Sequence, residues 1–126
     1  MELYIDFNSD QAIYVQLCNQ IIMEIATARI QEGDSLPSVR QLASTIGVNM
    51  HTVNKAYTIL KQDGFIKLDR RKGAVICIDV DKISVLSDMK HELAAVIARG
   101  LCNGVDREDT HSLVDEQYDE FLKQKG

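Results

Sequence analysis

The sequence of 126 residues predicts a mainly α-helical protein with one small β-hairpin. Three observations lead to this fold class. Two short amphipathic segments meet at a glycine within residues 36–57, and two segments rich in strand-forming residues follow within residues 65–78. Three longer helical segments, one before the two amphipathic segments and two after the hairpin, occupy most of the remaining chain. We therefore expect one compact domain over residues 1–78 and a helical region over residues 79–126.

The first element is a long helix, expected over residues 11–30. Its apolar residues fall on more than one stripe of a helical wheel, which is typical of a helix that packs at the centre of a domain. Ser9 or Asp10 can cap its start, and Gly33 follows its end. Pro37, the only proline, disfavours helix just before it, so a loop precedes the next element.

Residues 36–57 hold two short helices joined by a turn at Gly47. Ser38 and Gln41 have the spacing of a capping box for the first helix, and Asn49 is a natural cap for the second. The apolar positions expected to face the core are Val39, Leu42, Ala43 and Ile46, then Val53, Ala56, Tyr57 and Leu60. This spacing and the central glycine indicate a helix-turn-helix, whose second helix usually enters the DNA major groove.

The second short helix is expected to end at Asp63-Gly64, and a β-hairpin follows it. Residues 65–68 and 74–78 are rich in strand formers. The turn between them carries three consecutive positive charges, Arg70-Arg71-Lys72. A basic-tipped hairpin directly after a helix-turn-helix is typical of a wing. An ordinary solvated hairpin is the alternative, which is favoured only for a hairpin that stands alone.

Two further helices are expected in the C-terminal region, one over residues 81–102 and one capped by Asp106, with Asn103-Gly104 between them. Two helices of this length cannot bury both apolar stripes by themselves. A second copy of the chain is the simplest cover, since most soluble oligomers are two-fold homodimers. Folding back onto the N-terminal domain is the alternative. The positions expected to make the dimer contact are Leu86, Met89, Leu93, Val96, Ile97, Leu113, Tyr118 and Phe121.

The net charge of −5 is distributed unevenly along the chain. Residues 35–75 contain seven basic and two acidic residues, a net charge of +5. The segments before and after this window each carry a net charge of −5. Because binding to a polyanion depends on the local field and not on the total charge, the basic window favours contact with nucleic acid.

Composition and motifs exclude several classes of protein. No apolar run approaches the roughly 20 residues of a transmembrane helix, and the N-terminus lacks a signal-peptide pattern, so we expect a cytoplasmic protein without membrane contact. No glycine-rich phosphate loop, H-E-x-x-H motif or nucleophile constellation is present, so we expect no enzyme activity, metal or cofactor. Cys18, Cys77 and Cys102 form no C-x-x-C pair and are expected to be buried reduced thiols, with a redox-sensing thiol left open.

Three pieces of the sequence resemble the GntR family of bacterial transcription regulators. They are IYVQLCNQI at residues 13–21, GDSLPSVRQLASTIGVNMHTVNKAYTILKQDGFI at residues 33–66, and RRKGAVI at residues 70–76. The resemblance spans residues 12–78 and implies a winged helix-turn-helix domain that binds double-stranded DNA. The VNMHTVNKAY segment and the brief two-helix C-terminus look most like the YtrA-type subfamily. That likeness implies a small homodimeric bacterial repressor, of the kind that frequently controls transporter operons.

The outward side of the second short helix is expected to read DNA. Asn54 could pair with adenine edges, and His51 could donate to a guanine acceptor or reach a phosphate. Thr52 could meet a phosphate or a thymine methyl group, and Lys55 a phosphate. For each, a solvated surface residue is the alternative. The complete set expected to contact DNA is Arg40, Asn49, His51, Thr52, Asn54, Lys55, Arg70, Arg71, Lys72 and Gly73.

Arg40 and Gly73 are two of these positions that lie outside the second short helix. Arg40 is expected to contact the DNA backbone or a base, both by resemblance and by its place in the first turn of its helix, with a local ion pair as the alternative. Gly73 would let the wing backbone approach the duplex. Many family members have arginines where this chain has Met50 and Asn54, and these differences concern which operator is read.

The sequence therefore predicts a homodimeric regulator, a repressor by resemblance, with a DNA-binding domain over residues 1–78 and a dimerisation region over residues 79–126. The alternative is a sensor with a small-molecule effector at the dimer interface and DNA binding as its output, because residues 79–126 are too few to enclose a pocket of usual size. The basic window and wing tip argue against a winged helix that binds only proteins.

Overall fold

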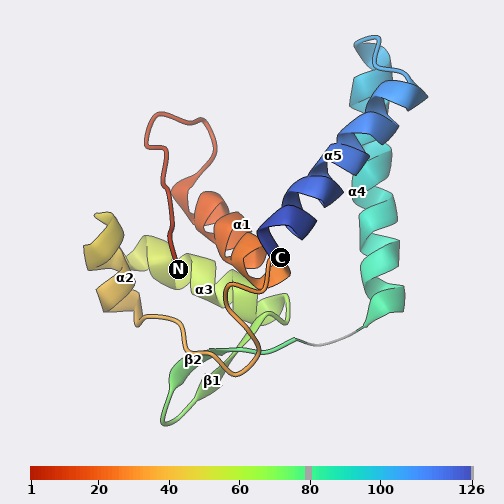
Figure 1. Cartoon of the computed structure of the whole chain (residues 1–126). Helices are drawn as coiled ribbons and strands as arrows, with labels where there is room; N and C mark the ends of the chain where they lie inside the picture. The colour runs from red at the N-terminus through yellow and green to blue at the C-terminus, as the bar shows by residue number, and fades with distance from the viewer. Residues whose placement is uncertain (79–80, 126) are drawn as a thin grey trace. The chain divides into compact units, whose positions relative to one another are not determined.

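The computed structural model describes residues 1–78 and 81–125, so the expected boundary between residues 78 and 79 falls outside the described residues. The chain divides into an N-terminal unit with α1 to β2 and a C-terminal unit with α4 and α5 (Figure 1). The mainly helical fold class with a two-stranded hairpin and C-terminal helices is confirmed. The elements are α1 (Ile13–Ala26), α2 (Val39–Ile46), α3 (Met50–Gln62), β1 (Ile66–Asp69), β2 (Gly73–Ile76), α4 (Lys82–Cys102) and α5 (Arg107–Lys125).

Helix α1 is shorter at both ends than the sequence pattern predicted. Ala12 holds the N-cap position without a side-chain hydrogen bond. The expected cap by Ser9 or Asp10 is therefore wrong, because both lie in the bend that precedes Ala12. At the other end Ala28 adopts a positive φ of 59°, which turns the chain out of the helix. Gly33 consequently lies in the following loop and does not end α1.

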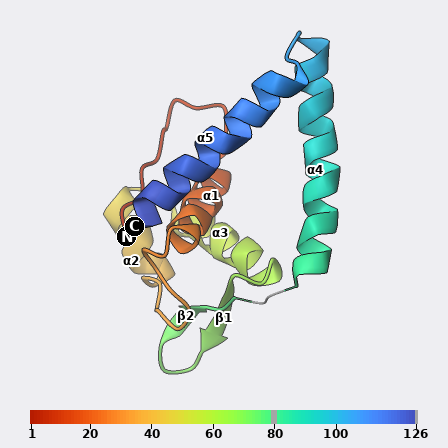
Figure 2. The ribbon, with the colours of Figure 1, turned by 45° about the vertical axis from the view of Figure 1, so that its right-hand side comes forward.

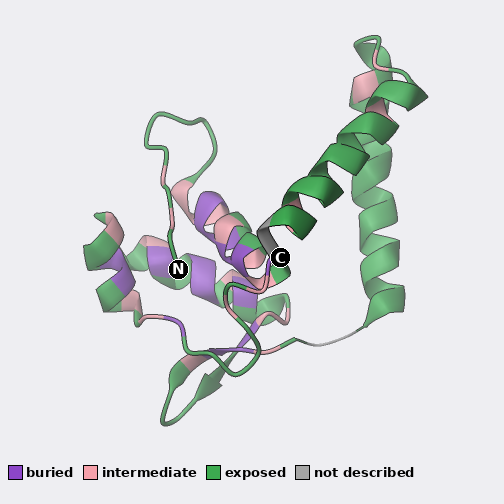
Figure 3. Ribbon diagram, viewed as in Figure 1, coloured by how far each residue is buried: buried purple, intermediate pink, exposed green. Residues whose placement is uncertain are grey.

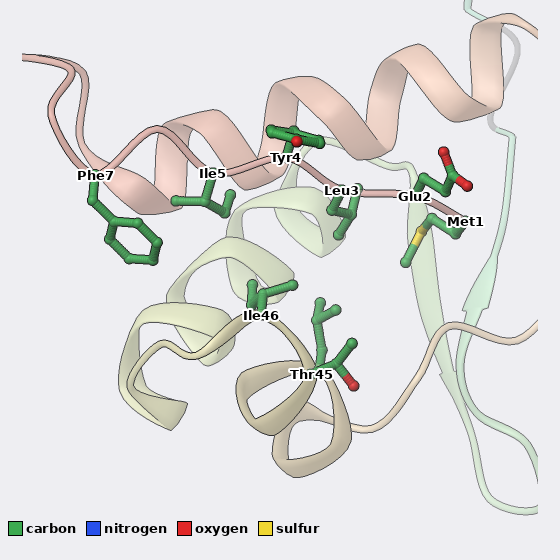
Figure 4. Close-up of a pocket in the computed structure, with 9 residues that line it drawn as sticks. Met1, Glu2, Leu3, Tyr4, Ile5, Phe7, Thr45 and Ile46 are labelled. Carbon is green, nitrogen blue, oxygen red and sulfur yellow. The ribbon is translucent and has the colours of Figure 1, made fainter.

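An extended segment at the N-terminus lies along α1, held by two glutamine side chains. The Gln16 amide accepts a hydrogen bond from the Asp6 backbone N–H at 2.9 Å and donates one to its carbonyl at 3.0 Å. Gln20 makes the same pair of bonds with the backbone of Tyr4. Figure 4 shows the side chains of this segment on one side of an open hollow of 540 Å³, with Thr45 and Ile46 on the other.

The helix-turn-helix has the end signals that the sequence predicted. Ser38 and Gln41 form a reciprocal capping box at α2, with both hydrogen bonds at 3.1 Å. Gly47 ends α2 in the left-handed region with a φ of 73°, which a residue with a side chain rarely adopts. The Asn49 side-chain oxygen accepts a hydrogen bond from the His51 N–H at 2.7 Å and so caps α3.

The core of the N-terminal unit lies between α1, α3 and the hairpin. Its largest fully buried side chains come from all three, Leu17 and Ile21 from α1, Val53 and Leu60 from α3, and Ile76 from β2 (Figure 3). Each such burial contributes about 1.5–3 kcal/mol relative to exposure. The predicted inward positions Leu42, Ala43, Val53, Ala56, Tyr57 and Leu60 are buried, while Val39 and Ile46 are half-buried.

The β-hairpin pairs β1 with β2 in antiparallel register, from Ile66 opposite Ile76 to Asp69 opposite Gly73. These strands overlap the predicted ones and are displaced by one or two residues. The loop before α2 lies along β2, because Ser35 forms a bridge with Val75. The tip of the hairpin projects away from the helices of its unit in both views of the ribbon (Figures 1 and 2).

The C-terminal unit is a pair of helices with a short connection. Asn103-Gly104 follows α4 as predicted, and the Asp106 carboxylate accepts a hydrogen bond from the Asp109 N–H at 2.9 Å, as expected of a cap. Gly100 lies against the connection, since a β-carbon there would meet the Val105 side chain at 3.5 Å, an ordinary van der Waals distance. No residue of α4 is buried (Figure 3).

The three cysteines are free thiols in different environments. Cys18 is buried in the core, and burial raises the pKa of its thiol, which therefore stays protonated. Cys77 is half-buried, whereas Cys102 is exposed. The prediction of buried thiols therefore holds for Cys18, is met only in part by Cys77 and is wrong for Cys102, because no side chain of the described residues covers that part of α4. Among the described helices, none has the length and apolar character needed to cross a bilayer.

Candidate nucleic-acid interface

The outward face of α3 is polar and lacks negative charge. Val53, Ala56, Tyr57 and Leu60 face the core, which leaves the opposite side of the helix in solvent. The exposed residues on that side are His51, Asn54, Lys55, Thr58 and Gln62. No acidic residue occurs between residues 35 and 62, although the chain contains 19 Asp and Glu residues. This face can therefore approach a polyanion without charge repulsion.

Hydrogen bonds within α3 determine which polar groups remain for a ligand. The Asn49 oxygen caps the helix, so only its amide N–H groups stay available as donors. The Thr58 hydroxyl donates to the Asn54 carbonyl at 2.8 Å. Thr52 is half-buried and offers less surface than its neighbours. Asn54 and His51 are exposed on this face, and no hydrogen bond within the described residues uses their side chains.

Lys55 is held by an aromatic ring from α1. Its ammonium nitrogen lies 4.0 Å from the centroid of the Tyr14 ring, which is the geometry of a cation–π interaction. The sequence analysis missed this contact because the two residues are far apart in the chain and share no local pattern. The interaction limits the freedom of the Lys55 side chain on the outward face of α3.

Tyr57 connects α3 with the start of α2. Its side chain is buried, and its hydroxyl donates a hydrogen bond to the carbonyl of Pro37 at 2.7 Å. Burial raises the pKa of Tyr57 to about 12. The bond ties α3 to the residue before the N-cap of α2, and so orients the first turn of α2 that carries Arg40. Arg40 is exposed and has no ion-pair partner within the described residues.

The wing tip has an ordered backbone that presents its cations. The Asp69 carboxylate accepts hydrogen bonds from the N–H groups of Arg71 at 2.8 Å and Lys72 at 3.0 Å, and these bonds lower the pKa of Asp69. Gly73 has a φ of 76°, as the tight turn requires. Arg70, Arg71 and Lys72 are all exposed at this tip.

Seven of the ten predicted contact residues fall into two groups on the N-terminal unit, while Arg40, Thr52 and Lys55 lie outside both. Asn49, His51 and Asn54 line one open hollow of 560 Å³ at the start of α3, and the wing residues form the second group at the hairpin tip. The hollow is also lined by Val39 and Met50, which the prediction did not include. Both are apolar, whereas every residue of the two short helices that was predicted to contact DNA has a polar side chain.

A helix-turn-helix followed by a basic-tipped wing defines the class of protein as a DNA-binding transcription regulator. The sequence model described as bacterial regulatory proteins, gntR family, matches residues 13–76. The chain belongs to the GntR family.

Relatives resemble this chain over most of its length. The HTH-type transcriptional repressor YtrA of Bacillus subtilis is 33% identical over 117 residues, which is 90% of each chain. A solved structure of YtrA from Sulfolobus acidocaldarius, a GntR-family transcription factor, is 40% identical with a TM-score of 0.66, and the match covers 79% of this chain and 97% of that one. A transcriptional antiterminator from Listeria monocytogenes EGD-e is 31% identical with a TM-score of 0.87, over 97% of this chain and 93% of that one. The resemblance to YtrA-type regulators is confirmed.

Proposed function

We propose that the protein is a homodimeric repressor whose two copies present α3 and the wing to a two-fold symmetric operator. The observation that carries the dimer is the apolar surface of the C-terminal unit. Leu93 and Ile97 of α4 remain 43% and 41% exposed, and Tyr118 of α5 remains 61% exposed. Apolar side chains that recur on a helix need a partner surface. A second copy of the same helices supplies one.

The proposed dimer contact comprises the positions that the sequence analysis selected. Most of them are large side chains that are exposed in the single chain, and Phe121 is half-buried. They are Leu86, Met89, Leu93, Val96, Ile97, Leu113, Tyr118 and Phe121. Repression as the outcome is supported by the likeness to a relative that is named a transcriptional repressor.

On the operator, we assign base contacts to Asn54 and His51, because their side chains lie on the outward face of α3 near its start. Lys55, Arg40 and the wing cations are assigned to phosphates, where they fix the position of α3 on the duplex. Asn49 and Thr52 have smaller roles, since one caps α3 and the other is half-buried. Gly73 permits a close approach of the wing backbone.

Selection of bound fragments from a random duplex pool tests the DNA side of this proposal. We expect two related half-sites in inverted orientation at one fixed spacing. Operator affinity should fall steeply with salt, with a slope of about −0.9 for each phosphate that is neutralised. A selected site without two-fold symmetry, or binding that is insensitive to salt, would overturn the proposal.

Leu93→Asp tests the dimer itself. It places a charge in the apolar stripe of α4, so light scattering at micromolar concentration should show a monomer, and operator affinity should fall together with the mass. Ala95→Asp is the matched control, because it adds the same charge to the opposite side of the same helix. The control should stay dimeric. A wild-type protein of monomeric mass would contradict the proposal directly.

A small-molecule effector is the second candidate, with DNA binding as the output. One observation favours it, a hollow of 420 Å³ at the corner of α4 and α5. This volume lies within the range of small-molecule sites, roughly 300–1,000 Å³, although the sequence led us to expect that residues 79–126 are too few to enclose a pocket of usual size. Its lining mixes apolar Ile97 and Leu101 with polar Arg107 and His111. An effector would change operator affinity when the small-molecule fraction of a cell extract is added to dialysed protein, and an unchanged affinity would argue against it.

A further inference from the structure

We infer that Met50, supported by Val39, forms an apolar contact for the 5-methyl group of a thymine in each operator half-site. Met50 would thereby determine sequence specificity beside the polar residues of α3. The inference rests on the proposed operator binding and adds a specificity determinant to it. It assigns a role in DNA recognition to Met50 and Val39, two apolar side chains that were not among the predicted DNA contacts.

The first observation is the exposure of Met50. It is the first residue of α3, and its side chain is 46% exposed. No other large apolar side chain of α3 is exposed, although exposed Met or Leu residues occur elsewhere in the chain. Exposed apolar surface is unfavourable in water, and it gains free energy when an apolar group covers it. At the first turn of a helix that reads DNA, such a group can come from the DNA.

The second observation is the hollow that Met50 lines. Val39, from the first turn of α2, contributes a second apolar wall, and Asn49, His51 and Asn54 contribute the polar part. The hollow is open, so an atom group on a neighbouring molecule can enter it. Because the Asn49 oxygen is already used in the cap, the hollow presents apolar surface together with the donors and acceptors of Asn54 and His51.

The chemistry of the major groove selects the partner. Among the edges that the four bases display there, the 5-methyl group of thymine is the apolar one. Met50 and Asn54 are four residues apart in α3, so their side chains lie on one face, one turn of about 5.4 Å apart. This separation corresponds to between one and two base steps of about 3.4 Å. A methyl group against Met50 is therefore compatible with an adenine contact by Asn54 one or two base pairs away.

Thymine-to-uracil replacement in the selected operator tests the inference, because it removes only the methyl group. Each thymine is replaced in turn, symmetrically in both half-sites, and affinity is measured by fluorescence anisotropy with the full-length protein. Burial of one methyl group is worth about fourfold in affinity. We expect one symmetric pair of positions at which uracil weakens wild-type binding by about fifteenfold, the product of two sites.

The Met50→Ala variant, combined with the thymine-to-uracil replacement, gives a double-mutant cycle. It should bind the thymine operator about as weakly as the wild type binds the uracil operator, and uracil should then cost it less than about twofold. Met50→Leu should retain most of the response, since leucine keeps an apolar side chain of similar volume. The salt slope should not change in either variant, because no phosphate contact is lost. An unchanged melting temperature shows that the fold is intact.

Leu68→Ala is the matched control, since Leu68 is another large exposed apolar side chain of the same unit, on β1. It should respond to uracil as the wild type does. Specific binding without any uracil-sensitive position, or with equal sensitivity in Met50→Ala, overturns this inference and leaves the proposed function standing. If no operator is bound at all, the proposed function and this inference fall together.

Discussion

The hydrogen bond from Tyr57 to Pro37 allows a quantitative test of how the helix-turn-helix is held together. Tyr57→Phe removes one oxygen atom and leaves the ring in the core, where the wild-type side chain is only 7% exposed. A hydrogen bond of this kind contributes about 1 kcal/mol net. We therefore expect the variant to lose about 1 kcal/mol of unfolding free energy at neutral pH, or roughly 4–8 °C in melting temperature for a domain of 60–100 residues.

The pH dependence of the same variant gives a sharper result. The pKa of Tyr57 is raised to about 12 in the folded protein, and a tyrosine in the unfolded chain ionises near pH 10. The stability that Tyr57 contributes is thus fully present below pH 10 and is lost between pH 10 and 12. At pH 11 the loss is about 1.4 kcal/mol. Phenylalanine has no such loss, so the variant should become as stable as the wild type, or slightly more stable, near pH 11.

Urea unfolding followed by circular dichroism at pH 7 and pH 11 measures both effects. The difference between the two proteins removes the contribution of the other tyrosines and lysines, which titrate in both. Protein concentration is kept equal, because dimerisation would make stability depend on it. A difference in free energy that is the same at both pH values would refute the burial argument for Tyr57.

Three further outcomes are expected. Gly47→Val should destabilise the protein by about 1–2 kcal/mol in a thermal melt, because a β-branched residue resists the φ of 73°, whereas Gly47→Asn should lose less. Tyr14→Leu should weaken operator binding by about two- to fivefold, as expected for loss of a cation–π contact to Lys55, while Tyr14→Phe should bind like the wild type; equal loss in both would contradict this role. Arg71→Ala should reduce the salt slope of operator binding by about 0.9, and an unchanged slope would place Arg71 away from phosphates.

The sequence predicted those parts of the fold whose causes are local. The capping box of Ser38 and Gln41, the turn at Gly47 and the cap at Asn49 each depend on residues within four positions of one another, so the pattern is sufficient. The ends of α1 were predicted less well. Ala12 has no capping side chain to identify it, and the unusual backbone of Ala28 leaves no signal in the residue type.

Contacts between distant segments were not predictable in the same way. The cation–π contact between Lys55 and Tyr14 and the hydrogen bond from Tyr57 to Pro37 depend on how α1, α2 and α3 pack. The outward face of α3 followed from its helical spacing, but the hollow beside it did not. That hollow is lined by Val39 from α2 and by residues at the start of α3, and no spacing within either helix encodes how the two helices meet.

The hydrogen bonds from Gln16 and Gln20 to the N-terminal segment constrain its backbone but neither its sequence nor its register along α1. Within this segment both amides bind main-chain groups, at residues 4 and 6, and so would accept almost any amino acid there. The Gln16 amide also donates a hydrogen bond to the Gln11 carbonyl at 2.9 Å, beyond the extended part of the segment. A slip of the segment by two residues would restore the same pattern of bonds, since the repeat of an extended chain is two. The two amides alone therefore do not distinguish the observed alignment of the segment along α1 from one that is shifted by two residues. The packing of the half-buried side chains of Leu3 and Ile5 must therefore fix the alignment. Substitutions at these two positions should be tolerated less well than substitutions at the positions next to them.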